Sequence, residues 1–220
     1  LYLAASDGAS LIKDNRAAFN NEYAIGVFDF LKELYNNNYF ARQRLSSSQD
    51  PFIQERYATL ITGPWQVQYL EKYKPDHLEY DFFPMLVPDN HTGPSYTYGD
   101  PKNIVIFNTC EDPQTAWEFI RSMITKEGDL QLLEITGQFP RRIQLGSDPY
   151  FAAFMEQNPK LQVFANQVDY IRGLDSHELI VEVMDIISQE YEACVLYDRK
   201  TSVEAIADAE RAVNILLGNK

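Results

Sequence analysis

Aromatic rings at turns and strand ends are the side chains of this sequence best suited to binding chemistry. Trp65 follows a Thr-Gly-Pro corner, and Tyr96 and Tyr98 alternate along the segment 95–100, so both tyrosines would lie on one face of a strand. Sugar sites combine such flat rings with planar polar groups that each bind two hydroxyls. The guanidinium of Arg141 is a planar group of this kind. The pattern favours a binding function for a carbohydrate.

Each of these side chains also has a purely structural interpretation. Trp65 would then plug the core between a strand and a helix, and the two tyrosines would pack on an edge strand. Arg141 or its neighbour Arg142 would form a surface salt bridge. The sequence leaves both interpretations open for every one of them.

Enzyme chemistry has little support in the sequence. The three histidines, His77, His91 and His177, do not show the spacing of a zinc site, and nucleophile-elbow, phosphate-loop and dinucleotide-binding glycine motifs do not occur. A carboxylate pair of the glycosidase kind has candidates in the acidic residues Glu111, Asp112, Asp100 and Asp175. Helix capping and solvated surface explain these acids more simply, so we predict a protein that is not an enzyme and needs no cofactor or metal.

Composition and charge narrow the classes of partner. Hydrophobic residues make up 45% of the 220 residues and charged residues 23%, as in folded globular domains. There are 32 Asp and Glu against 19 Lys and Arg, a net charge of −13. This balance argues against a nucleic acid and against an anionic membrane surface, since both bind clustered basic residues. No apolar run approaches the roughly 18 residues that suggest a membrane span.

The elements that must position these residues alternate between strands and helices. The segment Tyr57-Ala-Thr-Leu-Ile61 predicts a buried strand, Gly63 and Pro64 a corner, and 64–73 a helix, which places Trp65 beside unpaired N–H groups at the helix start. Further buried strands are expected over 78–83 and 103–107, and a short helix after the Asp50-Pro51 cap.

Helices dominate the rest of the sequence. Apolar periodicity and end signals predict helices over 22–37, from 113 to about 126, 127–136, 149–157, 159–166, 176–196 (capped by Asp175 and Ser176) and 201–217. Two cysteines, Cys110 and Cys194, do not make a disulfide framework, and a buried free thiol is the expected state of Cys194.

Several segments resemble, in order, motifs of the extracellular solute-binding proteins of ABC importers, of the maltose-binding type. The most informative is 52–65, whose ending YATLITGPW is similar to the family's A-A-M-x-I-x-G-P-W. Tyr98-Gly99-Asp100 stands where the family often carries a Gly-Gly pair, so a carboxylate replaces a glycine there. Further matches lie at 1–10 (LYLAASDGAS), 18–20 with 28–34, 83–88, 115–120, 136–141 and 201–206.

The resemblance implies an α/β fold, a type II periplasmic-binding-protein-like lobe with a mixed sheet flanked by helices, incomplete without an N-terminal lobe. The chain would then be a fragment. Residues 1–103 would form the first part of the C-terminal lobe, 104–150 a segment that crosses to the absent lobe, and 151–220 the helical remainder. The apolar side of the helix at 113–126 would lie exposed, which favours a dimer or another covering neighbour.

The resemblance also implies a function and a site. The protein would be the extracytoplasmic substrate-binding component of an ABC transporter, binding a sugar or oligosaccharide by hinge closure and passing it to permease membrane subunits. It would be periplasmic or extracellular, anchored as a lipoprotein in its full length. A receptor for a polyamine or a glycerol-phosphate ester is the alternative, and a glycan-processing enzyme a more distant one. The expected ligand-binding residues are Trp65, Tyr96, Tyr98, Gly99, Asp100 and Arg141.

Overall fold

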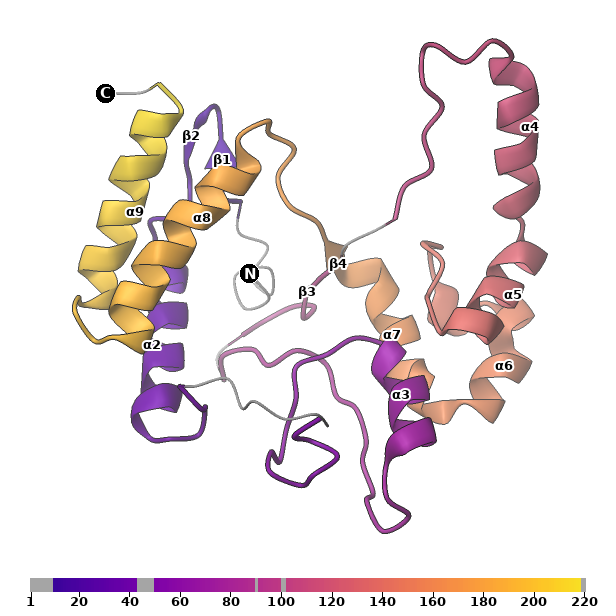
Figure 1. Cartoon of the computed structure of the whole chain (residues 1–220), viewed down its shortest axis with the longest axis horizontal. Coiled ribbons are helices and arrows are strands. Elements are labelled where there is room, and N and C mark those ends of the chain that lie inside the picture. Colours follow the sequence, from indigo (N-terminus) through magenta and orange to yellow (C-terminus); the bar gives the residue numbers. More distant parts are fainter. Residues whose placement is uncertain (1–9, 43–49, 90, 100–101, 219–220) are drawn as a thin grey trace. The chain divides into compact units, whose positions relative to one another are not determined.

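The computed structural model describes residues 10–42, 50–89, 91–99 and 102–218 (Figure 1). The motif at 1–10, apart from its last residue, and Asp100 lie outside these ranges. The chain divides into two compact units, each assembled from separated stretches of sequence. Unit 1 draws on 1–46, 85–98 and 172–220, and unit 2 on 47–84 and 99–171.

Three helices form the body of unit 1: α2 (Glu22–Asn36), α8 (Ile180–Tyr191) and α9 (Ser202–Leu216). α8 packs along α9, and α2 packs on α9 and on the π-helical turn η5 (Glu192–Leu196) that continues α8 (Figure 1). Their apolar sides meet in one core, whose fully buried members are Val183, Cys194, Val195, Ala205, Ile206, Ala209 and Val213.

Local sequence signals set the ends of α2 and α9. The side chain of Asn21 accepts a hydrogen bond from the backbone N–H of Ala24, and Asn38 takes the positive φ of 59° that closes the far end of α2. Thr201 and Glu204 cap α9 reciprocally, each side chain bonded to the other's backbone N–H. The helices predicted over 22–37 and 201–217 are confirmed.

A hairpin of β1 (Ile12–Lys13) and β2 (Arg16–Ala17) packs against α9. Its turn residues Asp14 and Asn15 both have positive φ, the conformation of the two-residue turn that suits the twist of a hairpin. Asp175 holds the start of this hairpin: its carboxylate accepts hydrogen bonds from the N–H groups of Leu11 at 2.5 Å and Ile12 at 2.8 Å.

The predicted capping role of Asp175 is therefore wrong. α8 begins at Ile180, without a side-chain cap, instead of at residue 176. The carboxylate is used by backbone N–H groups 163 and 164 residues away in the sequence. A long-range partner replaced the local one that the sequence suggested.

Unit 2 contains three longer helices, α3 (Trp65–Tyr73), α4 (Pro113–Met123) and α5 (Lys126–Thr136). A run of short turns follows: η1 (Leu145–Ser147), η2 (Pro149–Phe151), α6 (Ala152–Gln157), η3 (Pro159–Leu161), α7 (Gln162–Gln167) and η4 (Val168–Tyr170). These elements confirm the helices predicted between 113 and 166. Their core contains Val67, Leu133, Leu145, Phe151, Met155, Leu161, Ala165 and Val168.

The strands predicted over 57–61, 78–83 and 103–107 are not formed. Most of the first and all of the third segment are solvent-exposed, and Phe107 is 73% exposed. A β-branched or aromatic run becomes a strand only when another strand pairs with its backbone, and none does so within the described residues. After Asp50-Pro51 the chain makes hydrogen-bonded turns instead of the predicted helix, with Asp50 accepting from the N–H of Phe52.

Side-chain contacts hold the segment 78–83 in place of a sheet. The hydroxyl of Tyr80 donates to Glu71 of α3 at 2.5 Å, and Lys160 bonds the same carboxylate at 3.0 Å while lying over the Tyr80 ring. These two donors, the hydroxyl first, lower the pKa of Glu71. The neighbouring Phe82 packs edge-on against Phe164 of α7.

Two short strands, β3 (Thr97–Tyr98) and β4 (Ile171–Arg172), form a second two-stranded sheet where the chain passes from one unit to the other. Sheet structure in the described residues is thus limited to two small ladders. The unit boundaries after 46, 84, 98 and 171 differ from the expected divisions after 103 and 150. Residues 104–150 all fall in unit 2, and their assignment to a lobe beyond this chain stays a prediction. No helix of the described chain is long and apolar enough to cross a membrane.

Candidate ligand-binding residues

Trp65 is the first residue of α3, and its side chain is 58% exposed. Val67 and Leu70 of the same helix are buried and fill the space against the rest of unit 2. Trp65 therefore does not plug the core. The indole ring folds back over the backbone of Gly63, where any added β-carbon would overlap it. The corner thus presents an aromatic face on a short, closely packed backbone turn.

A buried glutamine, which the sequence did not single out, supports this corner. Gln66 is 7% exposed and donates a hydrogen bond to the carboxylate of Asp50 at 3.1 Å. It also lies at hydrogen-bond distance, 3.5 Å, from the hydroxyl of Thr62. Asp50 and Thr62 both precede Trp65 in the sequence, so the amide of Gln66 connects the start of α3 to two earlier points of the chain. The role of Gln66 depends on the burial of its polar side chain. The sequence does not show directly which polar residues are buried, so it gave no signal of this role.

The tyrosines predicted to share a strand face lie in unit 1, with Tyr98 in β3 and Tyr96 just before it. Both side chains are partly buried. The guanidinium of Arg172, the last residue of β4, lies over the ring of Tyr96 with its central carbon 4.2 Å from the ring centre. Sequence reasoning missed Arg172, because the contact joins residues 76 positions apart, with no shared motif.

Gly99 follows β3 and packs closely against Ile171 of β4. A β-carbon at position 99 would overlap the Ile171 side chain, so glycine is required for this approach. The role predicted for Gly99 was close approach of backbone to ligand; the neighbour that the structure provides is a side chain of the same unit. Asp100, the next predicted residue, lies outside the described ranges.

The two arginines after Phe139-Pro140 serve the packing of unit 2. Arg141 donates to the backbone carbonyl of Val168 at 2.9 Å and so ties the loop to η4. Arg142 forms an ion pair with Asp129 of α5 and donates to the carbonyl of Ile124. The surface salt bridge considered from the sequence is therefore made by Arg142. Trp65, Gly99 and Arg141 belong to unit 2, whereas Tyr96 and Tyr98 belong to unit 1.

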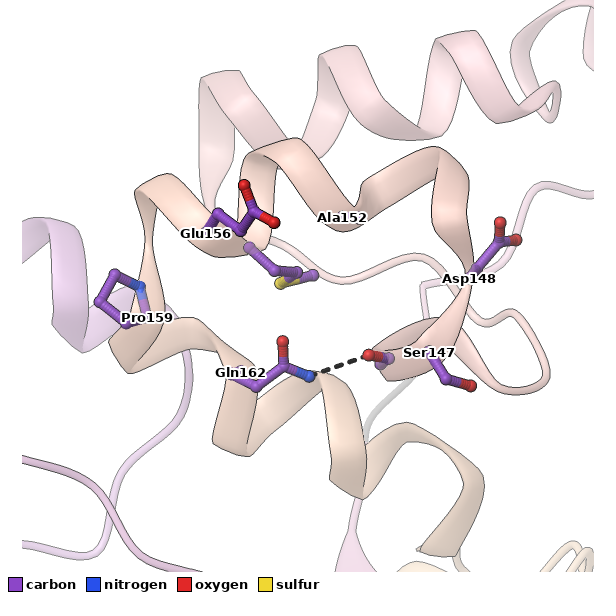
Figure 2. Close-up of a pocket in the computed structure, with 8 residues that line it drawn as sticks. Ser147, Asp148, Ala152, Glu156, Pro159 and Gln162 are labelled. Atoms are coloured by element: carbon purple, nitrogen blue, oxygen red, sulfur yellow. Dashed lines mark hydrogen bonds between the residues drawn. The ribbon is translucent and has the colours of Figure 1, made fainter.

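A pocket of about 420 Å³ lies within unit 2, between α6 and α7 (Figure 2). Glu156 and Gln162 lie on opposite sides of it, and Met155 and Pro159 contribute apolar surface. Most of its polar groups already have partners. Gln162 donates to the carbonyl of Gly146 at 3.0 Å and to Asn166 at 2.8 Å. The carboxylate of Asp148 pairs with Lys126 at 2.6 Å, and this ammonium is the main cause of its lowered pKa.

Two of the four acidic residues considered for catalysis, Asp112 and Asp175, have structural partners. Asp112 caps α4, accepting from the N–H of Thr115 at 3.0 Å and from its hydroxyl at 2.7 Å, and these bonds lower its pKa. Asp175 holds the β1 hairpin, as described above. No group of three or more His, Cys, Asp or Glu side chains within the described residues has the geometry of a metal site.

Residues 1–163 match the sequence profile of the bacterial extracellular solute-binding proteins. The chain belongs to this family. The corner bearing Trp65 and the glycine approach at residue 99 both lie inside the matched range. Members of the family are binding proteins, and the family is extracellular by its description. No curated protein matches the chain.

Solved structures with a similar fold are consistent with this family assignment. This solute-binding protein is similar to the uncharacterized protein lmo0859 from Listeria monocytogenes, with a TM-score of 0.85 and 25% identity over 99% of this chain. It is also similar to the sugar-binding protein MalE from Xanthomonas citri, with a TM-score of 0.84 and 16% identity over 99%. A third likeness is to the cyclic alpha-maltosyl-1,6-maltose binding protein from Arthrobacter globiformis, with a TM-score of 0.79 and 17% identity over 100%.

These likenesses confirm the predicted fold class, with a smaller sheet than expected. The solute-binding protein chain spans 55% of the length of each of these three structures, so it corresponds to part of the fold.

Proposed function

We propose that this chain is part of the substrate-binding component of an ABC importer and that its ligand is a sugar or an oligosaccharide. The observation that carries the proposal is the half-exposed indole of Trp65, held over Gly63 at a braced corner. A flat, exposed ring with few rotatable bonds can stack on the apolar face of a pyranose at little entropic cost. Two of the similar structures are described as a sugar-binding protein and a cyclic-maltosyl-maltose-binding protein, which supports the same class of ligand.

Ligand binding would proceed by hinge closure in the full-length protein. A ligand that contacts both lobes shifts the population towards the closed state by its additional contacts there. The closed form would then be recognised by permease membrane subunits. The full-length protein would be periplasmic or extracellular and anchored as a lipoprotein. Trp65, Tyr96, Tyr98, Gly99, Asp100 and Arg141 remain the proposed ligand-binding residues, although the Arg141 guanidinium gives one of its N–H groups to Val168.

Exposed apolar side chains on 104–150 support a covering partner, for which we propose the first lobe of the full-length protein. α4 buries none of its residues, yet it carries Trp117, Phe119 and Met123. The preceding segment exposes Val105 and Phe107 as well. The chain alone should then dimerise or bind a hydrophobic dye, and the full-length protein should do neither. A monomeric, dye-negative chain would contradict this assignment.

The function is tested with the full-length protein, first lobe included, in a thermal-shift screen of linear oligosaccharides. A ligand at about 100 times its Kd adds about 2.7 kcal/mol of stability, which raises the Tm by several degrees. Trp65→Ala should abolish that shift. Trp117→Ala is the matched control, because it removes the other tryptophan and should leave the ligand-induced shift in place. A shift with a polyamine or a glycerol-phosphate ester alone would replace the sugar by another solute, and hydrolysis products would indicate an enzyme.

A further inference from the structure

Within the described residues Arg172 has no acidic partner, unlike three other basic residues of unit 1. Lys32, Lys200 and Arg211, also in unit 1, all form ion pairs with Asp or Glu. Within the described residues, Arg172 forms neither an ion pair nor a hydrogen bond; its one contact of this kind is the stack on Tyr96.

The contact with Tyr96 restrains the guanidinium while the side chain stays exposed. Arg172 is exposed, and its central carbon lies 4.2 Å from the centre of the Tyr96 ring. A guanidinium on an aromatic face keeps its five N–H donors in the plane of the group, where they can reach solvent or a ligand. Part of the rotamer entropy that binding would cost has therefore been lost already.

The position of the pair also matters. Tyr96 precedes β3 and Arg172 ends β4, at two of the four places where the chain passes between unit 1 and unit 2. Just beyond them on the unit 2 side, Gly99 packs tightly against Ile171. The backbone beneath the stacked pair is thus restrained by strand pairing and by close packing, so the guanidinium edge has a defined direction.

We propose that Arg172, held over Tyr96, is a ligand-binding group of this protein, and that its guanidinium edge takes two adjacent oxygen atoms of a sugar. The inference rests on the proposed sugar-binding function and adds to it a residue and a chemistry. Two parallel N–H donors match a pair of oxygens at neighbouring positions. Such pairs occur as vicinal hydroxyls of a neutral sugar and as the carboxylate of an acidic sugar. Lysine cannot replace this fork, because its ammonium is a point donor.

Calorimetry on the full-length protein tests the proposal. The probes are maltotetraose, cellotetraose and xylotetraose as neutral sugars and digalacturonate as an acidic one. With the probe that binds best, Arg172→Ala and Arg172→Lys should each weaken binding about 10-fold or more, the loss expected for a charged hydrogen-bond pair. Tyr96→Phe should keep the affinity, because phenylalanine still supports the stack, and Tyr96→Leu should weaken it. Binding of neutral probes alone identifies vicinal hydroxyls, and binding of digalacturonate alone identifies a carboxylate.

Arg199 supplies the matched control. It also lies in unit 1 with its guanidinium over a tyrosine, at 5.1 Å from the ring centre of Tyr197, but away from β3 and β4. Arg199→Ala makes the same charge change and should leave affinity unchanged. If Trp65→Ala weakens binding while Arg172→Ala stays within about twofold of wild type, the role of Arg172 is refuted and the sugar-binding function stands. If no sugar binds the wild-type protein, the proposed function fails and the inference fails with it.

Discussion

The indole ring of Trp65 covers the backbone of Gly63, two residues earlier in the chain. Gly63 is buried by this ring, while the ring itself stays more than half exposed. Because Gly63 has no side chain, the Trp65 ring can lie directly over its backbone. Pro64 between them begins the helical turn and restricts the backbone further.

Replacing Gly63 by alanine should rotate the indole away from the corner without unfolding the protein. The new methyl group overlaps the ring, and an exposed ring can move at small cost, so we expect a stability loss below about 1 kcal/mol. The tryptophan emission spectrum should change, measured in a Trp117→Phe background so that Trp65 alone emits. Gly26→Ala, where the new methyl meets no atom, is the control and should leave the spectrum unchanged.

Asp175→Ala should destabilise unit 1 by about 2–4 kcal/mol. Its carboxylate accepts two backbone N–H groups at the start of the β1 hairpin, and hydrogen bonds to a charged group contribute about 1.5–3 kcal/mol each, with partial recovery by water. Urea unfolding measures the loss. Asp185→Ala is the control. It removes an exposed acid of α8 that forms no side-chain hydrogen bond or ion pair with the described residues, and it should change stability by less than about 0.5 kcal/mol. Equal losses of unfolding free energy in both variants would contradict the role of Asp175 in holding the β1 hairpin.

Helix positions in this protein follow from short stretches of sequence, which is why they could be predicted. α2 is bracketed by Asn21 and Asn38, and α9 by the Thr201–Glu204 box. The capping partners lie within four residues of one another, so the sequence contains the whole interaction. The same holds for Asp112 at the start of α4.

Contacts between distant residues could not be predicted in this way. Asp175 carries the local signature of a cap, but its partners lie on β1, and only the folded chain brings them together. The segments 57–61 and 103–107 have strand composition, but pairing depends on a neighbour that the local sequence does not specify. The site shows the same division. The sequence predicted the corner that carries Trp65 but left the exposure of its ring open, whereas Gln66 and Arg172 gain their roles from burial and from a long-range stack.

Acid should destabilise the protein through carboxylates whose pKa values are lowered in the folded state. Lys126 lowers the pKa of Asp148, so this ion pair contributes stability above the ordinary carboxyl value of about 4 and loses it as the pH falls through the folded value. Asp112, Asp198 and Asp208 are shifted in the same direction. The urea midpoint should therefore fall between pH 5 and about pH 3.

Asp148→Asn isolates one contribution to that acid sensitivity. Asparagine can still accept from the N–H of Tyr150, which Asp148 caps at 3.0 Å, but it cannot pair as an anion with Lys126. Stability should drop at neutral pH, and the further loss towards pH 3 should be smaller than in the wild type. Glu156→Gln, at an exposed carboxylate of the same pocket, should leave the acid slope as it is (Figure 2). An unchanged slope in Asp148→Asn would show that the ion pair contributes no pH-dependent stability.

The two thiols should react with a soluble disulfide reagent at very different rates. Both cysteines are free; Cys110 follows an exposed turn and is partly accessible, whereas Cys194 is fully buried beside Ser202 in the core of unit 1. In the native protein one thiol per chain should react promptly, and Cys110→Ser should remove that reaction. Cys194 should react only when α8 and α9 separate, so its rate should rise with urea in parallel with unfolding of unit 1. Prompt reaction of both thiols in the native protein would contradict this prediction, because the free energy of opening the core around Cys194 would then be far smaller than the free energy of global unfolding.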